Sequence, residues 1–151
     1  MMSIDNQLIR YQGGCLCGEI RYSVGNLGRH MGHCHCSMCR KFHGAAFATF
    51  GEASKEQFQW LSGESFLKTY VASNGTKRTF CSHCGSSLLF KSPNMPSDIV
   101  EFSLGTLDTD IPYKPDAHIF IENKACWYEI EQPLPQYAQG RDSSRVDAGN
   151  N

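Results

Sequence analysis

The chain has 151 residues, of which 40% are hydrophobic and 19% are charged, which predicts a globular protein with one ordinary hydrophobic core rather than two domains. Its formal net charge of −1 is the opposite of the balance expected for a generic nucleic-acid-binding protein, so we expect no nucleic-acid partner. No run approaches the roughly 18 apolar residues of a membrane helix, and the N-terminal MMSIDNQLIR lacks the apolar centre of a secretory signal, so we expect a cytoplasmic protein without a membrane partner.

Short alternating segments bounded by Gly, Asn, Ser and Pro run through the chain, a pattern typical of antiparallel strands. The first of them, residues 19–24, places Ile20, Tyr22 and Val24 on one face. Further strands are expected, in chain order, at residues 45–50, 57–63, 65–71, 77–81, 86–90, 99–105, 117–122 and 125–130.

Helix is expected only as a short turn, within residues 37–42 or 51–57, because no segment shows a long 3.6-residue period. Beyond residue 138 the chain holds almost no apolar residues, a composition typical of a loose tail. The sequence therefore predicts a single, mainly β domain over residues 1–138 and a disordered tail over residues 139–151.

The eight cysteines fall into three groups and one isolated residue. An even number of cysteines permits a disulfide framework, but neighbours one or two residues apart would close strained loops that add little stability. The same spacing lets thiolates converge on one metal ion, so the grouping favours metal binding over disulfides. The groups are Cys15 and Cys17, then Cys34, Cys36 and Cys39, then Cys81 and Cys84, with Cys126 alone.

The outer pairs, Cys15 with Cys17 and Cys81 with Cys84, each have a glycine directly after the second cysteine. Glycine tolerates positive φ, so a tight turn can aim backbone N–H groups at thiolate sulfur. Together the two pairs supply the four thiolates of a closed tetrahedral structural zinc site. The alternative is a set of buried or redox-active thiols, although the βαβ context of a thioredoxin-like C-x-x-C pair is missing.

The middle group, Cys34, Cys36 and Cys39, offers three thiolates within six residues and leaves a fourth metal position open, as in catalytic zinc sites. In an extended C-x-C the side chain of the middle residue, His35, points away from the metal that its neighbours face. Spacing alone therefore does not identify a fourth ligand. Because three protein ligands hold a metal less firmly than four, we expect this second zinc to be the more labile one. The imidazoles that could close the fourth position are His33, His35 and His43.

Cys126 alternates with Tyr128 and Ile130, which predicts a small buried residue on a core-facing strand rather than the reactive thiol of a sulfur redox enzyme. Four cationic residues lie beside the cysteine groups. They either stabilise thiolates and bind substrate carboxylates, or they are solvated charges on exposed strands. These residues are Arg40, Lys41, Lys77 and Arg78.

The order of the motifs GGCLCGEIRY, HCHCSMCRKFHG, RTFCSHCGSSL, GTLD and HIFIENKACWYEI…LPQY, from Gly13 to Tyr137, resembles the glutathione-dependent formaldehyde-activating enzyme family, to which a domain of centromere protein V is related. The resemblance implies a β-tent fold of antiparallel sheets stapled by zinc, as in zinc-binding Rab exchange factors and methionine sulfoxide reductase B. It also implies two zinc ions per chain, one structural and one catalytic. The implied structural ligands are Cys15, Cys17, Cys81 and Cys84, and the implied catalytic ligands are Cys34, Cys36 and Cys39. Other family motif positions, without an assigned role, are Gly105, Asp108, His118 and Trp127.

The resemblance further implies condensation of glutathione with formaldehyde to S-(hydroxymethyl)glutathione, the reverse of a carbon–sulfur lyase reaction. Zinc on three thiolates would bind and deprotonate the incoming thiol while the protein holds both reactants together. We therefore expect a zinc-dependent carbon–sulfur lyase that acts on glutathione or a similar small thiol and an aldehyde, or on their adduct. The alternative is a non-catalytic zinc module that binds a protein or a small molecule. Whether the fourth position is open or closed by a side chain discriminates between the two.

Overall fold

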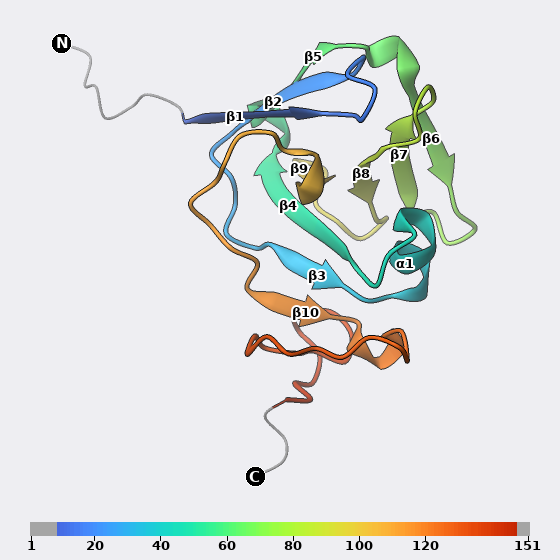
Figure 1. Ribbon diagram of the computed structural model, residues 1–151, viewed down its shortest axis with the longest axis vertical. Helices are drawn as coiled ribbons and strands as arrows, with labels where there is room; N and C mark the ends of the chain where they lie inside the picture. The colour runs from blue at the N-terminus through green and yellow to red at the C-terminus, as the bar shows by residue number, and fades with distance from the viewer. Residues whose placement is uncertain (1–8, 148–151) are drawn as a thin grey trace, which may run out of the picture. The chain divides into compact units, whose positions relative to one another are not determined.

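The computed structural model describes residues 9–147, and strands dominate it (Figure 1). The chain divides into two compact units. Among the described residues, the first unit comprises the chain up to Gly28 and Glu52–Pro112, and the second comprises Arg29–Gly51 and the chain from Tyr113 onward. The mainly β fold class predicted from the alternating segments is confirmed.

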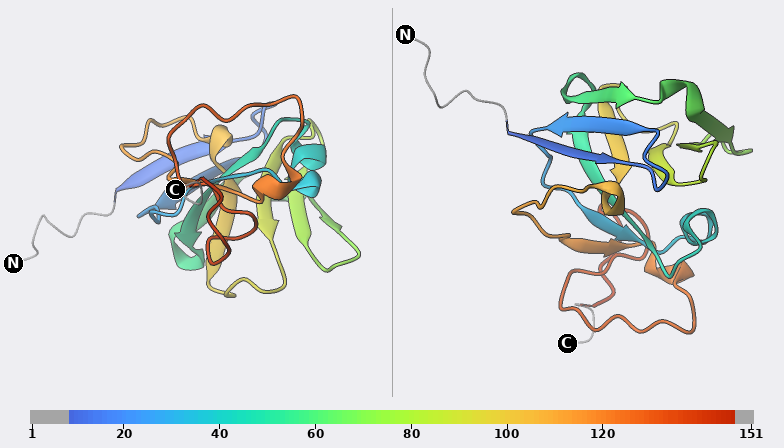
Figure 2. Two further views of the ribbon diagram at one scale, coloured as in Figure 1. Left: turned by 90° about the horizontal axis from the view of Figure 1, so that it is seen from below. Right: turned by 45° about the horizontal axis from the view of Figure 1, so that its top comes forward.

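The first unit contains a three-stranded antiparallel sheet in the order β1-β2-β5 (Figure 2, right). Tyr22 lies at the centre of this sheet, where its ring stacks on Phe58 at 4.8 Å and meets the edge of Phe102 at 5.8 Å. Ile20, Tyr22 and Val24 are all buried, as the alternating pattern predicted. The strands are β1 (Arg10–Gly14), β2 (Arg21–Gly25) and β5 (Phe58–Ser62).

A second set of strands in the first unit forms an antiparallel meander, so that each strand pairs with the next one along the chain. Figure 1 shows these strands in green to yellow. The connection from β7 to β8 carries one of the outer cysteine pairs, because β7 ends at Cys81 and the turn that follows holds Cys84. The strands are β6 (Leu67–Val71), β7 (Lys77–Cys81), β8 (Ser87–Lys91) and β9 (Ile99–Ser103), and the connections hold the 3₁₀ turns η2 (Lys55–Gln57), η3 (Glu64–Phe66) and η4 (Leu104–Thr106).

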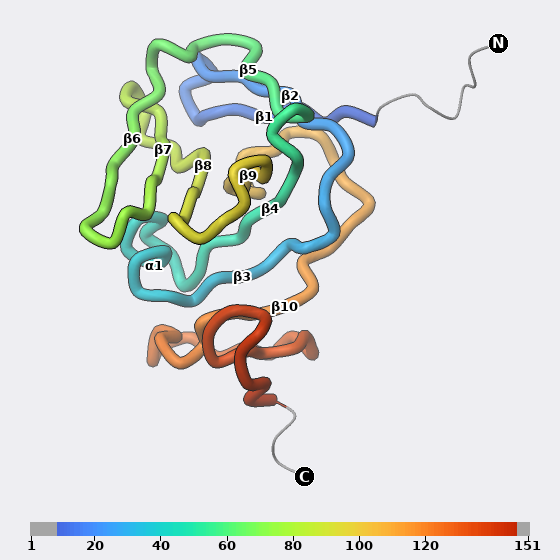
Figure 3. The backbone as a smooth tube through the Cα atoms, turned by 180° about the vertical axis from the view of Figure 1, so that it is seen from behind, coloured from blue at the N-terminus to red at the C-terminus, as the bar shows by residue number. Residues whose placement is uncertain are grey.

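In the second unit, strand β3 (Gly32–Cys34) lies between β10 (Ala117–Ile119) and the start of β4 (Ala48–Ser54). The β3–β4 pair is antiparallel, but β10 runs parallel to β3. This parallel pair departs from the antiparallel pattern predicted for the chain, since β10 follows a long connection rather than a hairpin. Helix α1 (Ser37–His43) follows β3 after only two residues (Figure 3), and the 3₁₀ turn η5 (Ile121–Asn123) follows β10.

Residues 125–130, which the alternation predicts as a strand, form a turn instead. The Lys124 ammonium group donates hydrogen bonds to the carbonyls of Ala125 and Tyr128, which closes the segment on itself. Cys126 is therefore exposed rather than buried, and Trp127 beside it is 70% exposed. The sequence-based argument that burial keeps Cys126 unreactive was wrong.

The chain beyond residue 138, predicted as a loose tail, is hydrogen-bonded in the part that the structure describes. Ala138 N–H donates to the Ser144 carbonyl at 2.9 Å, and Val146 N–H donates to the Gln136 carbonyl at 2.9 Å. Residues 148–151 lie outside the described residues. Within the described part of the chain, no helix is long and apolar enough to cross a membrane.

Candidate metal centres

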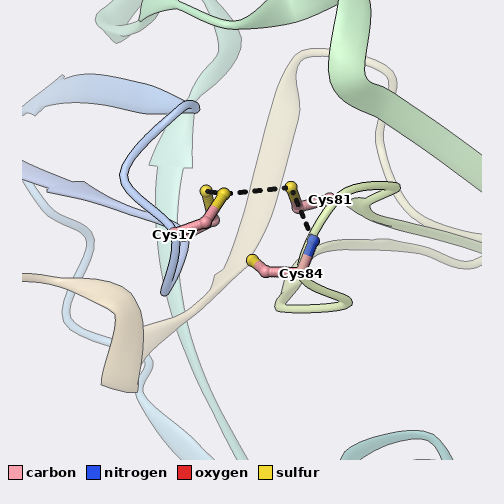
Figure 4. Close-up of side chains that lie close together, drawn as sticks. Cys17, Cys81 and Cys84 are labelled. Carbon is pink, nitrogen blue, oxygen red and sulfur yellow. Dashed lines mark hydrogen bonds between the residues drawn. The ribbon is translucent and has the colours of Figure 1, made fainter.

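Four cysteine sulfurs meet in the first unit, all within 4.8 Å of one another (Figure 4). Cys15 and Cys17 come from the loop after β1, Cys81 ends β7, and Cys84 lies in the turn before β8. The Sγ atoms of Cys15 and Cys17 are 3.5 Å apart, and those of Cys17 and Cys81 are 3.9 Å apart. These distances are close to the separation of about 3.8 Å between thiolates on one tetrahedral zinc ion. All four thiols are free of disulfides, so this set could hold a metal ion.

The glycines after the two pairs shape both turns. Gly18 and Gly85 have φ values of 83° and 82°, which confirms the positive φ expected at these positions. Each turn also directs a backbone N–H toward sulfur. Ile20 N–H donates to Cys15 Sγ at 3.3 Å, and Cys84 N–H donates to Cys81 Sγ at 3.4 Å. Such N–H groups stabilise negative charge on sulfur, as metal-bound thiolates need.

The thiols of this cluster hold their protons unequally. At Cys84, desolvation raises the pKa, but hydrogen bonds from Ser86 and from the backbone outweigh it and lower the pKa to about 5. At Cys17, a backbone hydrogen bond from Glu19 lowers the pKa, but desolvation and the neighbouring thiols together raise it to about 12. One thiol therefore ionises readily, while the last proton leaves only when a cation neutralises the crowded sulfurs.

Three further sulfurs meet in the second unit, again within 4.8 Å of one another. Cys34 ends β3, where the register places it opposite Ile119 of β10 and Ala48 of β4. Cys36 is the N-cap residue of α1, and its Sγ accepts a hydrogen bond from the Cys39 N–H at 3.2 Å. Cys34 and Cys39 are buried and Cys36 is half-buried. Hydrogen bonding with Cys36 and Cys39, followed by burial, raises the pKa of Cys34, so a cation is again needed before all three thiols ionise.

The histidines near this cluster contact partners other than the sulfurs. His35 Nε2 lies 2.8 Å from His118 Nδ1, and His33 Nδ1 lies 2.7 Å from Thr49 Oγ1. His43, at the end of α1, meets the edge of the Phe50 ring at 5.6 Å. Among the described residues, the cluster contains three cysteines and no histidine or carboxylate.

Burial favours the neutral form of His33, His35 and His118. Desolvation, assisted by charge repulsion from His118, lowers the pKa of His33 and of His35 to about 4. Desolvation also lowers the pKa of His118, although Gln132 opposes the shift. Gln132 does not reach hydrogen-bond geometry with the outer nitrogen of His118, Nε2, which is buried without a partner among the described residues. The sequence had marked His118 only as a family motif position, and no local pattern indicates its contact with His35.

The predicted cationic residues occupy different environments. Arg40 and Lys41 lie in the last turn of α1, directly after Cys39. Arg40 Nε is buried and makes no hydrogen bond within the described part of the chain. Lys77 is exposed, whereas Arg78 is buried against the Phe90 ring, with its guanidinium carbon 5.0 Å from the ring centre. Arg40 is therefore the cation whose position fits an anion-binding role beside the three cysteines.

Two of the remaining motif positions lie on the surface or in turns. Asp108 forms an ion pair with Arg21, at 2.6 Å between Oδ2 and Nη1, and its side chain is 63% exposed. Gly105 lies within η4. Neither position joins a cysteine cluster.

A small, mainly β protein with a four-thiol cluster and a three-thiol cluster belongs to the class of proteins that could hold two metal ions through cysteine. The sequence pattern described as "Glutathione-dependent formaldehyde-activating enzyme" matches residues 10–123. The chain belongs to this family, as its motif order had suggested.

Three known proteins show how far the similarity extends. A Halomonas elongata protein with the provisional name glutathione-dependent formaldehyde-activating enzyme is 30% identical over 127 residues, covering 80% of each chain. An uncharacterized lyase of Schizosaccharomyces pombe is 30% identical over 133 residues, covering 82% of this chain and 94% of that protein. The crystal structure of a Rhodobacter sphaeroides protein, 24% identical, superposes with a TM-score of 0.57 over 67% of this chain and 91% of that one. The two named relatives support an enzyme, and the solved structure supports the fold.

Proposed function

We propose that this protein is a zinc-dependent carbon–sulfur lyase that acts on a small thiol such as glutathione and an aldehyde, or on their adduct. The observation that carries the proposal is the convergence of Cys34, Cys36 and Cys39 without a fourth ligating side chain among the described residues. A site that keeps one position for substrate is the arrangement of catalytic rather than structural zinc. This feature favours the enzyme over the alternative of a non-catalytic zinc-binding module.

The proposal assigns different roles to the two clusters. The first-unit cluster (Cys15, Cys17, Cys81 and Cys84) would hold a structural zinc, and the second-unit cluster (Cys34, Cys36 and Cys39) would hold the more labile, catalytic one. Zinc held by Cys34, Cys36 and Cys39 would supply binding and deprotonation of the substrate thiol. Three thiolates donate much charge to the metal and weaken it as a Lewis acid, so activation of the thiol fits better than polarisation of the aldehyde.

The protein's own contribution is to bind and orient the thiol. Arg40 and Lys41 follow Cys39 on α1. Their positive charges would attract the carboxylates of a substrate such as glutathione. In the condensation, the thiol sulfur forms a bond to the aldehyde carbon, and the thiol proton ends on the former carbonyl oxygen. The carbonyl π bond opens and no group leaves, so positioning the two reactants provides much of the acceleration.

Exchange spectroscopy on S-(hydroxymethyl)glutathione at equilibrium tests the proposal, with the uncatalysed rate subtracted. Zinc-loaded wild type should accelerate exchange, and Cys36→Ser should not, although it keeps the four-cysteine cluster. The matched control is Cys126→Ser, which removes an exposed cysteine outside both clusters and should keep full activity. Full activity in Cys36→Ser would show that the assigned site is wrong. No acceleration by wild type would rule out this substrate pair.

A second comparison tests the role of Arg40. Arg40→Leu should slow the reaction of glutathione more than that of 2-mercaptoethanol, which has no carboxylate. An equal loss with both thiols would contradict carboxylate binding by Arg40. The cytoplasmic location and the single domain over residues 1–138 remain predictions that accompany this function.

A further inference from the structure

We propose that His118 is a positioning residue, which acts through His35 to fix the direction of the Cys34 and Cys36 sulfurs. The inference rests on the proposed metal site at the three cysteines. It starts from a side-chain hydrogen bond between the C-x-C segment and β10, the 2.8 Å contact of His35 Nε2 with His118 Nδ1.

The position of His35 in the chain explains how this contact orients the neighbouring sulfurs. His35 lies between two of the proposed ligands, and in extended chain its side chain points opposite to theirs. A rotation of the segment about its own axis would therefore move the imidazole and both sulfurs together. Holding the imidazole in place holds the two sulfurs in the direction that faces Cys39.

The ring of His35 is enclosed on several sides. It is fully buried, with the centres of the Phe47 and Tyr128 rings 5.0 Å and 6.1 Å from its own centre. Its backbone N–H donates to the Ile119 carbonyl at 2.9 Å, so β10 holds both the main chain and the side chain of this residue. The hydrogen bond with His118 then fixes one orientation of the His35 ring among these aromatic neighbours.

His118 is itself fixed on both sides of its peptide unit. Its N–H donates to the Pro135 carbonyl at 2.8 Å, and its carbonyl accepts from the Tyr137 N–H at 2.9 Å. The side chain is fully buried. His118 therefore presents Nδ1 from a rigid backbone, which is what a residue needs in order to position another.

The two imidazoles also match as hydrogen-bonding groups. At 2.8 Å the two ring nitrogens are at hydrogen-bond distance, and an imidazole nitrogen donates or accepts according to the tautomer of its ring. A single proton between Nε2 of His35 and Nδ1 of His118 makes one ring the donor and the other the acceptor. Removing Nδ1 of His118 would leave Nε2 of His35 buried without its partner, which is unfavourable. A shift of the His35 ring, and with it the C-x-C segment, would relieve this cost.

Two substitutions at residue 118 separate the hydrogen bond from the volume of the side chain. His118→Phe keeps a ring of similar size but has no nitrogen, whereas His118→Asn places a polar atom near the position of Nδ1. Zinc release to a chelator, followed with a colorimetric indicator, reports the two clusters as separate phases. The three-cysteine phase should be about tenfold faster or more in His118→Phe and should return toward the wild-type rate in His118→Asn. The four-cysteine phase should not change in either variant and serves as an internal control.

The matched control is Thr49→Val, which removes the partner of a neighbouring buried histidine, His33, without touching the pair. This variant should release zinc from the three-cysteine cluster at the wild-type rate. A wild-type rate in His118→Phe would overturn the positioning role while leaving the proposed function intact. Wild type that binds only one zinc would overturn the proposed catalytic site, and the positioning role with it.

A measurement on wild type keeps the proposal testable if His118→Phe does not fold. In ¹⁵N-labelled protein, a proton shared between the imidazoles gives a nitrogen–nitrogen scalar coupling across the hydrogen bond. We expect this coupling between one nitrogen of each ring. Independent tautomers without the coupling would show that the two histidines do not act as a unit.

Discussion

Replacement of Cys81 by serine should abolish the folded state of the protein. Cys81 is fully buried at the end of β7, and its Sγ accepts the Cys84 N–H and lies 3.9 Å from Cys17 Sγ. A serine hydroxyl is shorter and stays protonated, so it would be a poor fourth ligand for the proposed structural zinc. Structural zinc contributes about 10–16 kcal/mol of apparent binding free energy in zinc-finger peptides. Domains are stable by only about 5–15 kcal/mol, so the binding free energy lost with the ion is as large as the whole stability of a typical domain.

Thermal unfolding followed by circular dichroism measures this effect. Wild type should unfold in one transition that a strong chelator shifts to lower temperature, and Cys81→Ser should show no transition with or without added zinc. Cys126→Ser is the matched control, because its thiol is exposed and stands outside both clusters, and its melting temperature should equal that of wild type. A soluble Cys81→Ser protein with an unchanged melting temperature would refute the structural role of the metal.

Three further predictions follow from the thiols and the buried imidazoles. A chelator should remove zinc from the three-cysteine cluster first, and comparable release rates from both clusters would count against an open site. Iodoacetamide should alkylate Cys126 in the folded, zinc-loaded protein, while Cys34 and Cys39 react only after unfolding, as mass spectrometry of peptides would show. Because burial lowers the pKa of folded His118, the unfolded state binds more protons once the pH falls below about 6.5, and stability then decreases by up to about 1.4 kcal/mol per pH unit. Urea unfolding at pH 7.5 and 5.5 should show a smaller decrease in His118→Asn, and an equal decrease would contradict the neutral state of His118.

Local spacing in the sequence indicated which cysteines would meet within each group, because residues two or three positions apart cannot lie far from each other. The meeting of the Cys15 and Cys17 pair with the Cys81 and Cys84 pair was instead inferred from the four thiolates of a closed zinc site and from the family resemblance. The glycines after Cys17 and Cys84 added a conformational reason, and both adopt positive φ. The structure brings the same four and the same three sulfurs together.

Features that depend on contacts between distant segments could not be read from the sequence. Residues 125–130 alternate like a strand, yet Lys124 bonds to two carbonyls within the segment and turns it, so Cys126 is exposed. Similarly, the parallel pairing of β10 with β3 brings together residues 83 positions apart, His35 and His118. Alternation of apolar residues reports only which face of a strand is buried, not which strand lies beside it.

Burial of the sulfurs and the number of metal ligands have opposite effects on the order of zinc release. Comparing them explains why we expect the three-cysteine cluster to lose zinc first. Burial favours the opposite order, because Cys34 and Cys39 are buried while Cys17 of the other cluster is exposed to a chelator. Ligand number favours the order we predict, since a chelator must replace four thiolates at one cluster and three at the other. An open coordination position also lets a small chelator bind the metal before any thiolate leaves. Access to the metal itself, rather than to the sulfurs, should therefore decide the order.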